Sequence, residues 1–364
     1  MNPVMKILSI GIDKNIVDKN SSVSRRAIEY GNLVDKYHVL VTGDKNIKID
    51  LSSTAKVFSI KLRNKFRGFF DLKKRAIKLI KQNTYNLITV QDVYFLGLLA
   101  LKLTRQFNLG LEIQVHGFEK FKGIRKLIAK YVLKRADSIR TVSQRLKKQL
   151  INDFKVQEDK ITVVPIHVGV RIKEQGLRIK EKNDKFVFLT IGRLVPIKNI
   201  EMQIKAMANL SSKYPNIELW IIGEGQERKE LQVKSCRLQV SDKIKFLGQK
   251  DDLAKFYSRA NSFLLTSDYE GYGMVIIEAA SYGLPIIMTD VGCAGEFIKD
   301  NQNGLVINVK NQEALEEAMA KLIEDESLRI KLGNNARDSI KNLLTKEETL
   351  SLYKKSWEKA ISQT

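Results

Sequence analysis

Apolar and polar positions follow two alternating patterns along most of this chain. Short apolar runs end at polar or glycine positions, and the longer stretches between them repeat apolar residues every three or four positions. The first pattern predicts buried strands, and the second predicts helices with one buried face. Strands that alternate with helices in this way indicate an α/β fold, in which helices cover parallel sheets.

The patterns assign most of the chain to definite elements. The expected strands are Lys6–Ile12, Tyr37–Thr42, Tyr85–Val90, Gly110–Val115, Ala136–Val142, Ile161–Pro165, Phe186–Ile191, Ile217–Ile222, Lys245–Leu247, Phe263–Leu265 and Ile286–Met288. The expected helices are Val23–Leu33, Tyr94–Phe107, Gln144–Phe154, Ile200–Tyr214, Gln226–Leu238, Asp252–Ala260, Met274–Tyr282, Gln312–Asp325 and Leu328–Ser362.

A charged stretch with few core residues interrupts this alternation near the middle of the chain. It contains two near-copies, Arg171–Glu174 and Arg178–Glu181. This composition predicts a linker over residues 171–185 between an N-terminal domain, 1–170, and a C-terminal domain, 186–347. At 364 residues the chain is long enough for two such domains.

The positive charge of the chain lies almost entirely in its first half. Residues 1–170 hold 33 Lys and Arg against 14 Asp and Glu, and the remaining residues hold 30 against 27. Two segments, 61–82 and 118–135, combine these cations with apolar residues at helical spacing. Each is either a surface helix that docks on its own sheet or an interfacial helix that rests on anionic lipid. The charge also suits nucleic acid or a phosphorylated substrate.

The remaining composition restricts the compartment. Two cysteines, Cys236 and Cys293, cannot form a disulfide framework, which favours a reducing cytoplasm. No apolar stretch reaches the length of a membrane span, and the apolar start runs into Asp13 without a cleavage site. We therefore expect a cytoplasmic protein that is either free or peripheral at the inner face of the membrane.

The most informative stretch is 263–290, which predicts a strand, a polar loop, a helix and a second strand. Gly271 and Gly273 in the loop let a ligand approach the backbone, and the helix start offers free N–H groups to a phosphate. Glu270 and Glu278 stand on either side of that helix start, where carboxylates can accept hydrogen bonds from sugar hydroxyls. A diphosphate between two sugars is a nucleotide-sugar. The alternative is a solvated loop glutamate and a helix-capping glutamate.

Two other strand ends offer groups that suit a diphosphate. Gly192–Asn199 follows a strand and contains Arg193, which can bind phosphate oxygens through two parallel hydrogen bonds, and Lys198, a movable point charge. Gly223 and Gly225 form a glycine turn that suits the passage of a base or ribose. No Asp-x-Asp pair occurs in the chain, so no acidic clamp for a metal-bound diphosphate is evident and we expect no essential metal.

A histidine also follows a strand end in the N-terminal half. His116 precedes Gly117 directly after the strand Gly110–Val115, and it is one of three histidines in the chain. A lone histidine is more often structural than catalytic, but its place at the carboxyl end of a strand favours a functional role.

Taken together, these motifs resemble the retaining glycosyltransferase family 4. The resemblance rests on G-R-L-x-P-x-K-N from Gly192, I-I-G-E-G-x-E-R from Ile221, and E-G-Y-G-M-V-I-I-E-A from Glu270. G-L-P-I-I from Gly283 and the terminal helix with Trp357 also fit. The resemblance implies the GT-B architecture, in which two Rossmann-like domains face a central cleft. It also implies that a C-terminal helix, 348–364, returns to the N-terminal domain.

The resemblance also implies a role for each site residue. Glu278 would bind the ribose, Arg193 and Lys198 would hold the diphosphate, Glu270 would contact the donor sugar, and His116 would lie near its reactive end. The backbone of the Gly271–Met274 segment, which includes Tyr272 and Gly273, would approach the donor, as would Gly192, Gly223 and Gly225. Transfer would proceed with retention of configuration, without an essential metal, from a UDP- or GDP-sugar to a glycan or lipid-linked acceptor.

Two segments depart from the family pattern. The first loop, Asp13–Ser24, lacks the Gly-Gly of many members, and Pro165–Val170 replaces their Pro-Asn-Gly-Val-Asp. The resemblance therefore carries over no phosphate contact in that loop and no acceptor contact after Pro165. The alternatives are a GT-B epimerase or phosphorylase, although no pyridoxal-phosphate lysine motif is recognisable, and a nucleic-acid-binding protein. The basic segments lack the features of a nucleic-acid-binding module.

Overall fold

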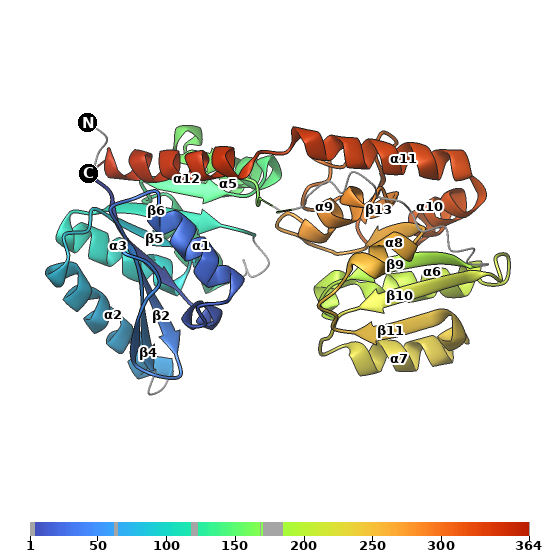
Figure 1. Ribbon diagram of the computed structural model, residues 1–364, viewed down its shortest axis with the longest axis horizontal. Coiled ribbons are helices and arrows are strands. Elements are labelled where there is room, and N and C mark those ends of the chain that lie inside the picture. Colours follow the sequence, from blue (N-terminus) through green and yellow to red (C-terminus); the bar gives the residue numbers. More distant parts are fainter. Residues whose placement is uncertain (1–3, 62–64, 118–122, 168, 170–184, 364) are drawn as a thin grey trace. The chain divides into compact units, whose positions relative to one another are not determined.

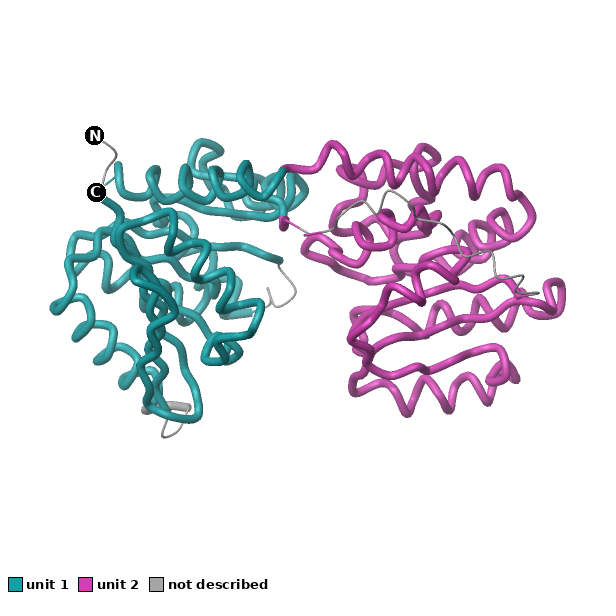
Figure 2. Tube along the Cα trace, viewed as in Figure 1, with its two compact units in different colours: residues 1–165, 345–364 teal, residues 166–344 magenta. Residues whose placement is uncertain are grey.

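The computed structural model describes residues 4–61, 65–117, 123–167, 169 and 185–363. The chain forms two compact units (Figures 1 and 2). Unit 1 comprises residues 1–165 and 345–364, and unit 2 comprises residues 166–344. The expected linker, 171–185, lies outside the described residues except for Lys185.

Unit 1 is built on an eight-stranded sheet in the order β3-β4-β2-β1-β5-β6-β7-β8. All its pairings are parallel except that of β3 with β4. The strands are β1 (Lys6–Gly11), β2 (Lys36–Gly43), β3 (Ile47–Asp50), β4 (Ala55–Lys61), β5 (Leu87–Val90), β6 (Gly110–Val115), β7 (Ser138–Thr141) and β8 (Ile161–Val163). The antiparallel edge strand β3 and its neighbour β4 were not among the expected strands.

Helices cover this sheet and connect its parallel strands (Figure 1). They are α1 (Ser22–Gly31), α2 (Lys65–Gln82), α3 (Phe95–Phe107), α4 (Ile124–Leu133), α5 (Gln144–Phe154) and α12 (Lys346–Ile361), with short 3-10 helices at Lys14–Val17 and Glu158–Lys160. The terminal helix α12 belongs to unit 1 although it follows unit 2 in sequence (Figure 2). Its Trp357 side chain is completely buried.

A buried polar cluster fixes α12 to the sheet. The Glu112 carboxylate on β6 is fully buried and accepts hydrogen bonds from Ser356 Oγ at 2.6 Å and Trp357 Nε1 at 3.2 Å. Arg140 Nε on β7 lies 3.3 Å from Glu112 Oε1, and its guanidinium stacks 3.6 Å from the ring centre of Tyr353. The contacts of Glu112 thus join two strands and the last helix.

Unit 2 is built on six parallel strands in the order β11-β10-β9-β12-β13-β14. They are β9 (Phe186–Ile191), β10 (Ile217–Ile222), β11 (Ile244–Gly248), β12 (Ser262–Leu265), β13 (Ile286–Thr289) and β14 (Leu305–Ile307). The helices are α6 (Ile200–Leu210), α7 (Arg228–Arg237), α8 (Ala254–Arg259), α9 (Met274–Ser281), α10 (Gln312–Glu324) and α11 (Glu326–Ser339), with 3-10 helices η3 (Pro196–Lys198), η4 (Ser241–Lys243) and η5 (Ile340–Asn342).

The expected tail helix over Leu328–Ser362 is wrong, because the structure divides it in two. Helix α11 ends at Ser339, η5 follows, and the chain is extended at Leu343 before α12 begins. Thr345 caps α12 by accepting a hydrogen bond from Glu348 N, while the Glu348 carboxylate accepts one from Thr345 N. This capping box starts a new helix, and the break lies where the chain leaves unit 2 for unit 1.

The α/β class is confirmed by these two largely parallel sheets. None of the helices in the described part of the chain combines the length and the apolar character that crossing a bilayer requires.

Candidate active site

Three loops of unit 2 meet at the carboxyl edge of its sheet. Strand β9 pairs in parallel with β10 on one side and with β12 on the other, so the loops that follow these three strands leave the same edge. The chain proceeds from β9 to β10 and β11 on one side, and then returns to β12 on the other. Such a reversal of strand order is where open α/β sheets bind ligands.

The loop after β9 is held in place by buried hydrogen bonds. Thr266 Oγ1, at the end of β12, donates to the carbonyl oxygens of Lys198 at 3.1 Å and Asn199 at 3.0 Å. Gln203 Nε2 on α6 donates in turn to Thr266 Oγ1 at 2.8 Å, and Asp268 N donates to Ile197 O at 2.8 Å. The loop that carries Lys198 is therefore fastened to the loop that carries Glu270.

Lys198 and Glu270 contact each other directly. The Lys198 ammonium forms an ion pair with Glu270 Oε1, and Ser267 Oγ donates to the same oxygen at 2.7 Å. The side chains are 20% and 13% exposed, respectively, so the pair is partly accessible to a ligand. Each group fixes the position of the other, and Lys198 compensates the charge of Glu270.

Arg193 lies on the same loop but in a different environment. Its side chain is exposed, and its guanidinium has no hydrogen-bond or ion-pair partner among the described residues. The five N–H donors of this group are therefore available to an anion from solution.

The two glycines after β10 are required by close backbone packing. Gly223 has a φ of 138°, and a Cβ atom there would lie 1.9 Å from Gly192 O. A Cβ atom at Gly225 would lie 2.2 Å from Leu194 O. Glycine at these positions lets the loops after β9 and β10 pack backbone against backbone. A contact with the donor stays a prediction for Gly192, Gly223 and Gly225.

The start of α9 is open towards solvent at its first residue. Gly273 precedes the helix with a φ of 95°, no side chain caps the helix start, and Met274 is 39% exposed. Tyr272 is buried, and burial followed by the charges of Cys293 and Glu296 raises the pKa of its hydroxyl. The first turn of α9 thus retains N–H groups that can face an anion.

Glu278 lies one turn further along α9 and has a specific partner. Tyr257 on α8 donates its hydroxyl to Glu278 Oε2 at 2.9 Å. Burial and then the Glu278 charge raise the pKa of Tyr257, whose ring stacks on Tyr282 with centres 5.1 Å apart. Tyr257 therefore stays protonated and orients one oxygen of the carboxylate.

His116 belongs to unit 1 and directly follows β6. Its side chain is exposed, and it lies at the carboxyl edge of the unit 1 sheet. Although the residue is accessible to solvent, partial desolvation, followed by the charges of Arg140 and Arg26, lowers the pKa of His116. At neutral pH the imidazole is therefore uncharged and can both donate and accept a hydrogen bond.

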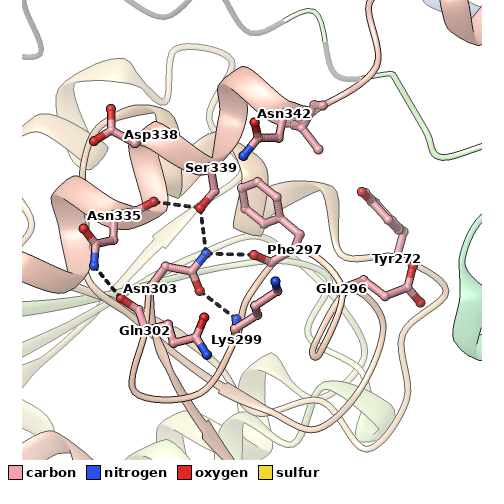
Figure 3. Close-up of a pocket in the computed structure, with 11 residues that line it drawn as sticks. Tyr272, Glu296, Phe297, Lys299, Gln302, Asn303, Asn335, Asp338, Ser339 and Asn342 are labelled. Carbon is pink, nitrogen blue, oxygen red and sulfur yellow. Dashed lines mark hydrogen bonds between the residues drawn. The ribbon is translucent and has the colours of Figure 1, made fainter.

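A polar cavity of about 540 Å³ lies beside the Glu270–Gly273 loop (Figure 3). Its lining includes Tyr272 and several amide and hydroxyl side chains that bond to one another. Asn303 Nδ2 donates to Phe297 O and to Ser339 Oγ, both at 2.8 Å, and Ser339 Oγ donates to Asn335 O at 2.7 Å. These hydrogen bonds fasten the loop that follows β13 to α11.

Several residues of this site were not singled out by sequence reasoning. Ser267 binds Glu270, Tyr257 binds Glu278, and a Cβ atom at Gly292 would lie 2.5 Å from Tyr272 O. Ser267 was detectable as a polar residue directly after a buried strand. Tyr257 and Gly292 contact the site only through tertiary packing, which sequence spacing does not show.

The described residues include no group of three or more His, Cys, Asp and Glu side chains that could hold a metal ion. The absence of an essential metal and of a cofactor stays a prediction, which activity after treatment with EDTA would test.

Two family models match the chain. The model described as glycosyl transferases group 1 matches residues 173–339, and the model described as Glycosyltransferase Family 4 matches residues 37–168. The chain is 29% identical over 170 residues to the lipopolysaccharide core biosynthesis glycosyltransferase LpsE of Rhizobium meliloti, an alignment that covers 47% of this chain and 49% of that protein. The chain thus spans about half the length of this relative.

Two further similarities extend over most of the chain. A Campylobacter jejuni N-acetyl-D-galactosaminyltransferase, named for an undecaprenol-diphosphate-linked substrate, is 28% identical over 307 residues, which cover 83% of this chain and 80% of that protein. The structure of HepE from Anabaena in complex with UDP matches with a TM-score of 0.77 and 19% identity, and it covers 99% of this chain and 100% of that one. The predicted GT-B fold is thereby confirmed.

Proposed function

Because two glycosyltransferase family models together match most of its length, the chain belongs to the GT-B glycosyltransferases, and we propose that it transfers a sugar from a nucleotide-diphosphate sugar. The acceptor is a glycan or a lipid-linked glycan in cell-surface polysaccharide synthesis. The observation that carries the proposal is the linked set of Lys198, Glu270 and Ser267 beside the exposed Arg193 at one sheet edge of unit 2.

A nucleotide-sugar suits this edge by its chemistry. Its diphosphate needs cations and N–H donors, which Arg193, Lys198 and the start of α9 offer. Its two sugars need hydrogen-bond acceptors, which the carboxylates of Glu270 and Glu278 offer on either side of that helix start. The structural relative HepE binds UDP, which supports a uridine nucleotide as the first donor to test.

The ion pair suggests how the donor is recognised. In the proposed complex, Lys198 remains beside Glu270 and also faces the diphosphate, while a hydroxyl of the donor sugar donates to the Glu270 carboxylate. The pair orients both groups before the donor arrives, so little reorganisation is required as charge develops on the leaving phosphate. Preorganised donors of this kind contribute about 10²–10³ in rate each.

Glu278 has the separate role of a nucleotide anchor in this proposal. Its Oε2 atom is oriented by Tyr257, and the carboxylate accepts hydrogen bonds from the ribose hydroxyls. Loss of Glu278 should therefore weaken nucleotide binding, whereas loss of Glu270 should slow the transfer step.

The chemistry proposed for the transfer keeps the configuration of the sugar. The bond between the anomeric carbon and the diphosphate oxygen breaks, the acceptor oxygen forms a bond on the same face, and the acceptor proton moves to the leaving phosphate. Arg193 and Lys198 stabilise the charge of the leaving group, and a role of His116 of unit 1 near the donor sugar stays a prediction of the family resemblance. No metal ion is required in this scheme.

The acceptor proposal rests on the relatives. LpsE is named for lipopolysaccharide core synthesis, and the Campylobacter transferase is named for a substrate linked to undecaprenol diphosphate. A glycan carried on a lipid, or a saccharide of a lipopolysaccharide core, is the corresponding acceptor class for this chain.

The first experiment combines the protein with UDP- and GDP-sugars and a mixture of lipid-linked acceptors, and follows nucleotide release together with product structure by NMR. We expect a product whose glycosidic linkage retains the anomeric configuration of the donor, and we expect full activity after treatment with EDTA. Arg193→Ala and Glu278→Ala should reduce turnover strongly, while Lys229→Ala on the exposed face of α7 should not. Unchanged turnover in the first two variants would refute the site, and epimerised donor without transfer would identify an epimerase.

A further inference from the structure

Helix α4 buries one face and leaves a second apolar face uncovered. Ala129, Val132 and Leu133 are completely buried against unit 1. Ile124 and Leu127 are 70% and 68% exposed, and Tyr131 is 42% exposed. The exposed residues follow the spacing i, i+3 and i+7, which places them on one side of the helix. A surface helix that only docks on its own sheet would not expose such a stripe.

The adjoining helix α3 also exposes apolar side chains. Phe95 is 52% exposed and Leu98 is 36% exposed, and both lie in the first turns of α3. The two helices are in contact, since a Cβ atom at Gly97 would lie 3.1 Å from Val132 Cγ1 and the Arg125 guanidinium lies 5.8 Å from the ring centre of Tyr94. We refer to the five exposed side chains as the α3–α4 ridge: Phe95, Leu98, Ile124, Leu127 and Tyr131.

The charged residues on the two helices are all cations. Neither α3 nor α4 contains an Asp or Glu residue. The exposed cations on and directly after the two helices are Lys102, Arg105, Arg125, Lys126, Lys130, Lys134 and Arg135. The guanidinium of Arg135 stacks 3.9 Å from the ring centre of Tyr131, which places a cation beside the ridge. Apolar side chains surrounded by cations match the headgroup region of an anionic bilayer.

Helix α2 provides an internal comparison, because its sequence has the same basic and amphipathic pattern. Its apolar residues Leu72, Ala76 and Leu79 are at most 2% exposed, and it also contains Asp71. Among the large apolar side chains of α2 that the structure describes, Phe70 alone is strongly exposed, at 69%. Over its described side chains α2 therefore docks on its own sheet, and the two segments that the sequence could not distinguish differ in the structure.

We propose that the α3–α4 ridge docks unit 1 on the surface of a bilayer that contains anionic phospholipid. The five apolar side chains enter the boundary between headgroups and acyl chains, and the surrounding cations face the lipid phosphates. A nucleic acid could use the cations but would leave the apolar stripe exposed to water, so it is the less suitable partner. The proposal rests on unit 1 alone and does not depend on the donor site of unit 2.

Vesicle sedimentation tests the proposal on the full chain. The vesicles consist of phosphatidylcholine alone, or of phosphatidylcholine and phosphatidylglycerol in equal proportion. We expect sedimentation with the second kind, little with the first, and a strong decrease as salt rises. Ile124→Ser with Leu127→Ser should weaken binding by about tenfold or more, because two buried apolar groups are lost. Lys126→Glu with Lys130→Glu should weaken it by at least about tenfold.

Matched controls separate the ridge from general charge effects. Lys229→Glu with Lys331→Glu changes the net charge equally on exposed positions of unit 2 and should leave vesicle binding unchanged. Thermal unfolding and UDP titration of the ridge variants should match the parent, which shows that unit 2 is unaffected. Undiminished vesicle binding of the Ile124 and Leu127 double variant would overturn the proposal. So would equal binding to neutral vesicles, or binding to duplex DNA but not to anionic vesicles.

Discussion

Two carboxylate–cation pairs of the molecule, one in each unit, have the same chemistry but different surroundings. Glu112 and Arg140 of unit 1 are 0% and 5% exposed and hold α12 on the sheet. Lys198 and Glu270 of unit 2 are 20% and 13% exposed and lie where three loops meet at the end of a sheet. The buried pair is surrounded by protein partners, whereas the pair at the sheet edge can still receive a ligand.

The difference indicates how structural and functional pairs can be distinguished. The Glu112 carboxylate accepts hydrogen bonds from Thr89, Ser356 and Trp357 in addition to the contact with Arg140. Burial lowers the pKa of Arg140, but the charges of Glu112 and the neighbouring tyrosines outweigh this and raise it. The network therefore keeps its charges without any ligand, although Arg140 Nη1 is buried without a hydrogen-bond partner among the described residues. Glu270 has Lys198 and Ser267 as partners, and both of these residues lie in loops at the carboxyl edge of the sheet.

The largest effect should come from breaking the buried pair. Glu112→Gln leaves the Arg140 guanidinium buried without its counter-charge, and we expect the free energy of unfolding of unit 1 to fall by about 3–5 kcal/mol. Urea unfolding in a Trp220→Phe background measures this, because Trp357 is then the only tryptophan and lies in unit 1.

The control for this variant is the exposed pair of Glu224 and Arg228, whose side chains are 48% and 29% exposed. Glu224→Gln should cost less than about 1 kcal/mol, because solvent screens the pair. If Glu112→Gln is as stable as Glu224→Gln, the claim that the buried Glu112–Arg140 pair stabilises unit 1 is wrong.

The pair at the sheet edge should respond in the opposite way. Lys198→Ala and Glu270→Gln should each lower turnover by about 10²–10³, since each removes a preorganised group from the reacting region. Both variants should unfold within about 1 kcal/mol of the parent, because the pair is partly solvated. Steady-state transfer kinetics and urea unfolding of the same samples check the two statements. Unchanged turnover together with a large loss of stability would show that this pair has a structural role and no catalytic one.

A smaller effect per pH unit is expected from a second buried polar pair of unit 1, His38 and Tyr85. His38 Nδ1 lies 2.5 Å from the Tyr85 hydroxyl, and burial followed by the charge of Lys36 lowers the pKa of His38 to about 4. The unfolded chain takes up this proton near pH 6.5 and the folded chain does not. Stability should therefore fall between pH 6.5 and pH 4, by up to about 1.4 kcal/mol per pH unit. The free energy of unfolding of His38→Gln, measured at several pH values, should lose this part of its pH dependence. If it falls with pH as steeply as that of the parent, His38 is not the group responsible.

The smallest effect should come from Tyr257→Phe. The variant keeps the ring stacked on Tyr282 and removes only the hydroxyl that orients Glu278. One hydrogen bond of this kind is worth about 1 kcal/mol, so UDP should bind roughly fivefold more weakly. Calorimetric titration measures the change, and Tyr214→Phe, in a tyrosine bonded to Glu324 on the surface of unit 2, serves as the control. If Tyr257→Phe binds UDP as tightly as the parent does, the Tyr257 hydroxyl does not contribute to nucleotide binding.

Much of the fold was predictable because its parallel strands are continuous apolar runs. The edge strand β3 was missed because all but one of its residues are exposed, so its sequence lacks the pattern of a buried run. The short strand β14 and the end of α11 were missed because their bounds depend on tertiary packing. The strand-end residues Arg193, Lys198 and Glu270 were predictable from their positions after apolar runs. The contact between Lys198 and Glu270 was not, because it depends on the pairing of β9 with β12.

The most direct test of the account is a calorimetric titration of UDP into the parent chain, Glu278→Gln and Glu270→Gln, with transfer measured on the same samples. We predict that Glu278→Gln weakens UDP binding by about tenfold or more, which corresponds to about 1.4 kcal/mol. We predict that Glu270→Gln binds UDP like the parent and transfers little sugar. No UDP binding by the parent, or the same behaviour of both variants, would contradict the assignment of unit 2 as the donor-binding unit with separate anchoring and transfer carboxylates.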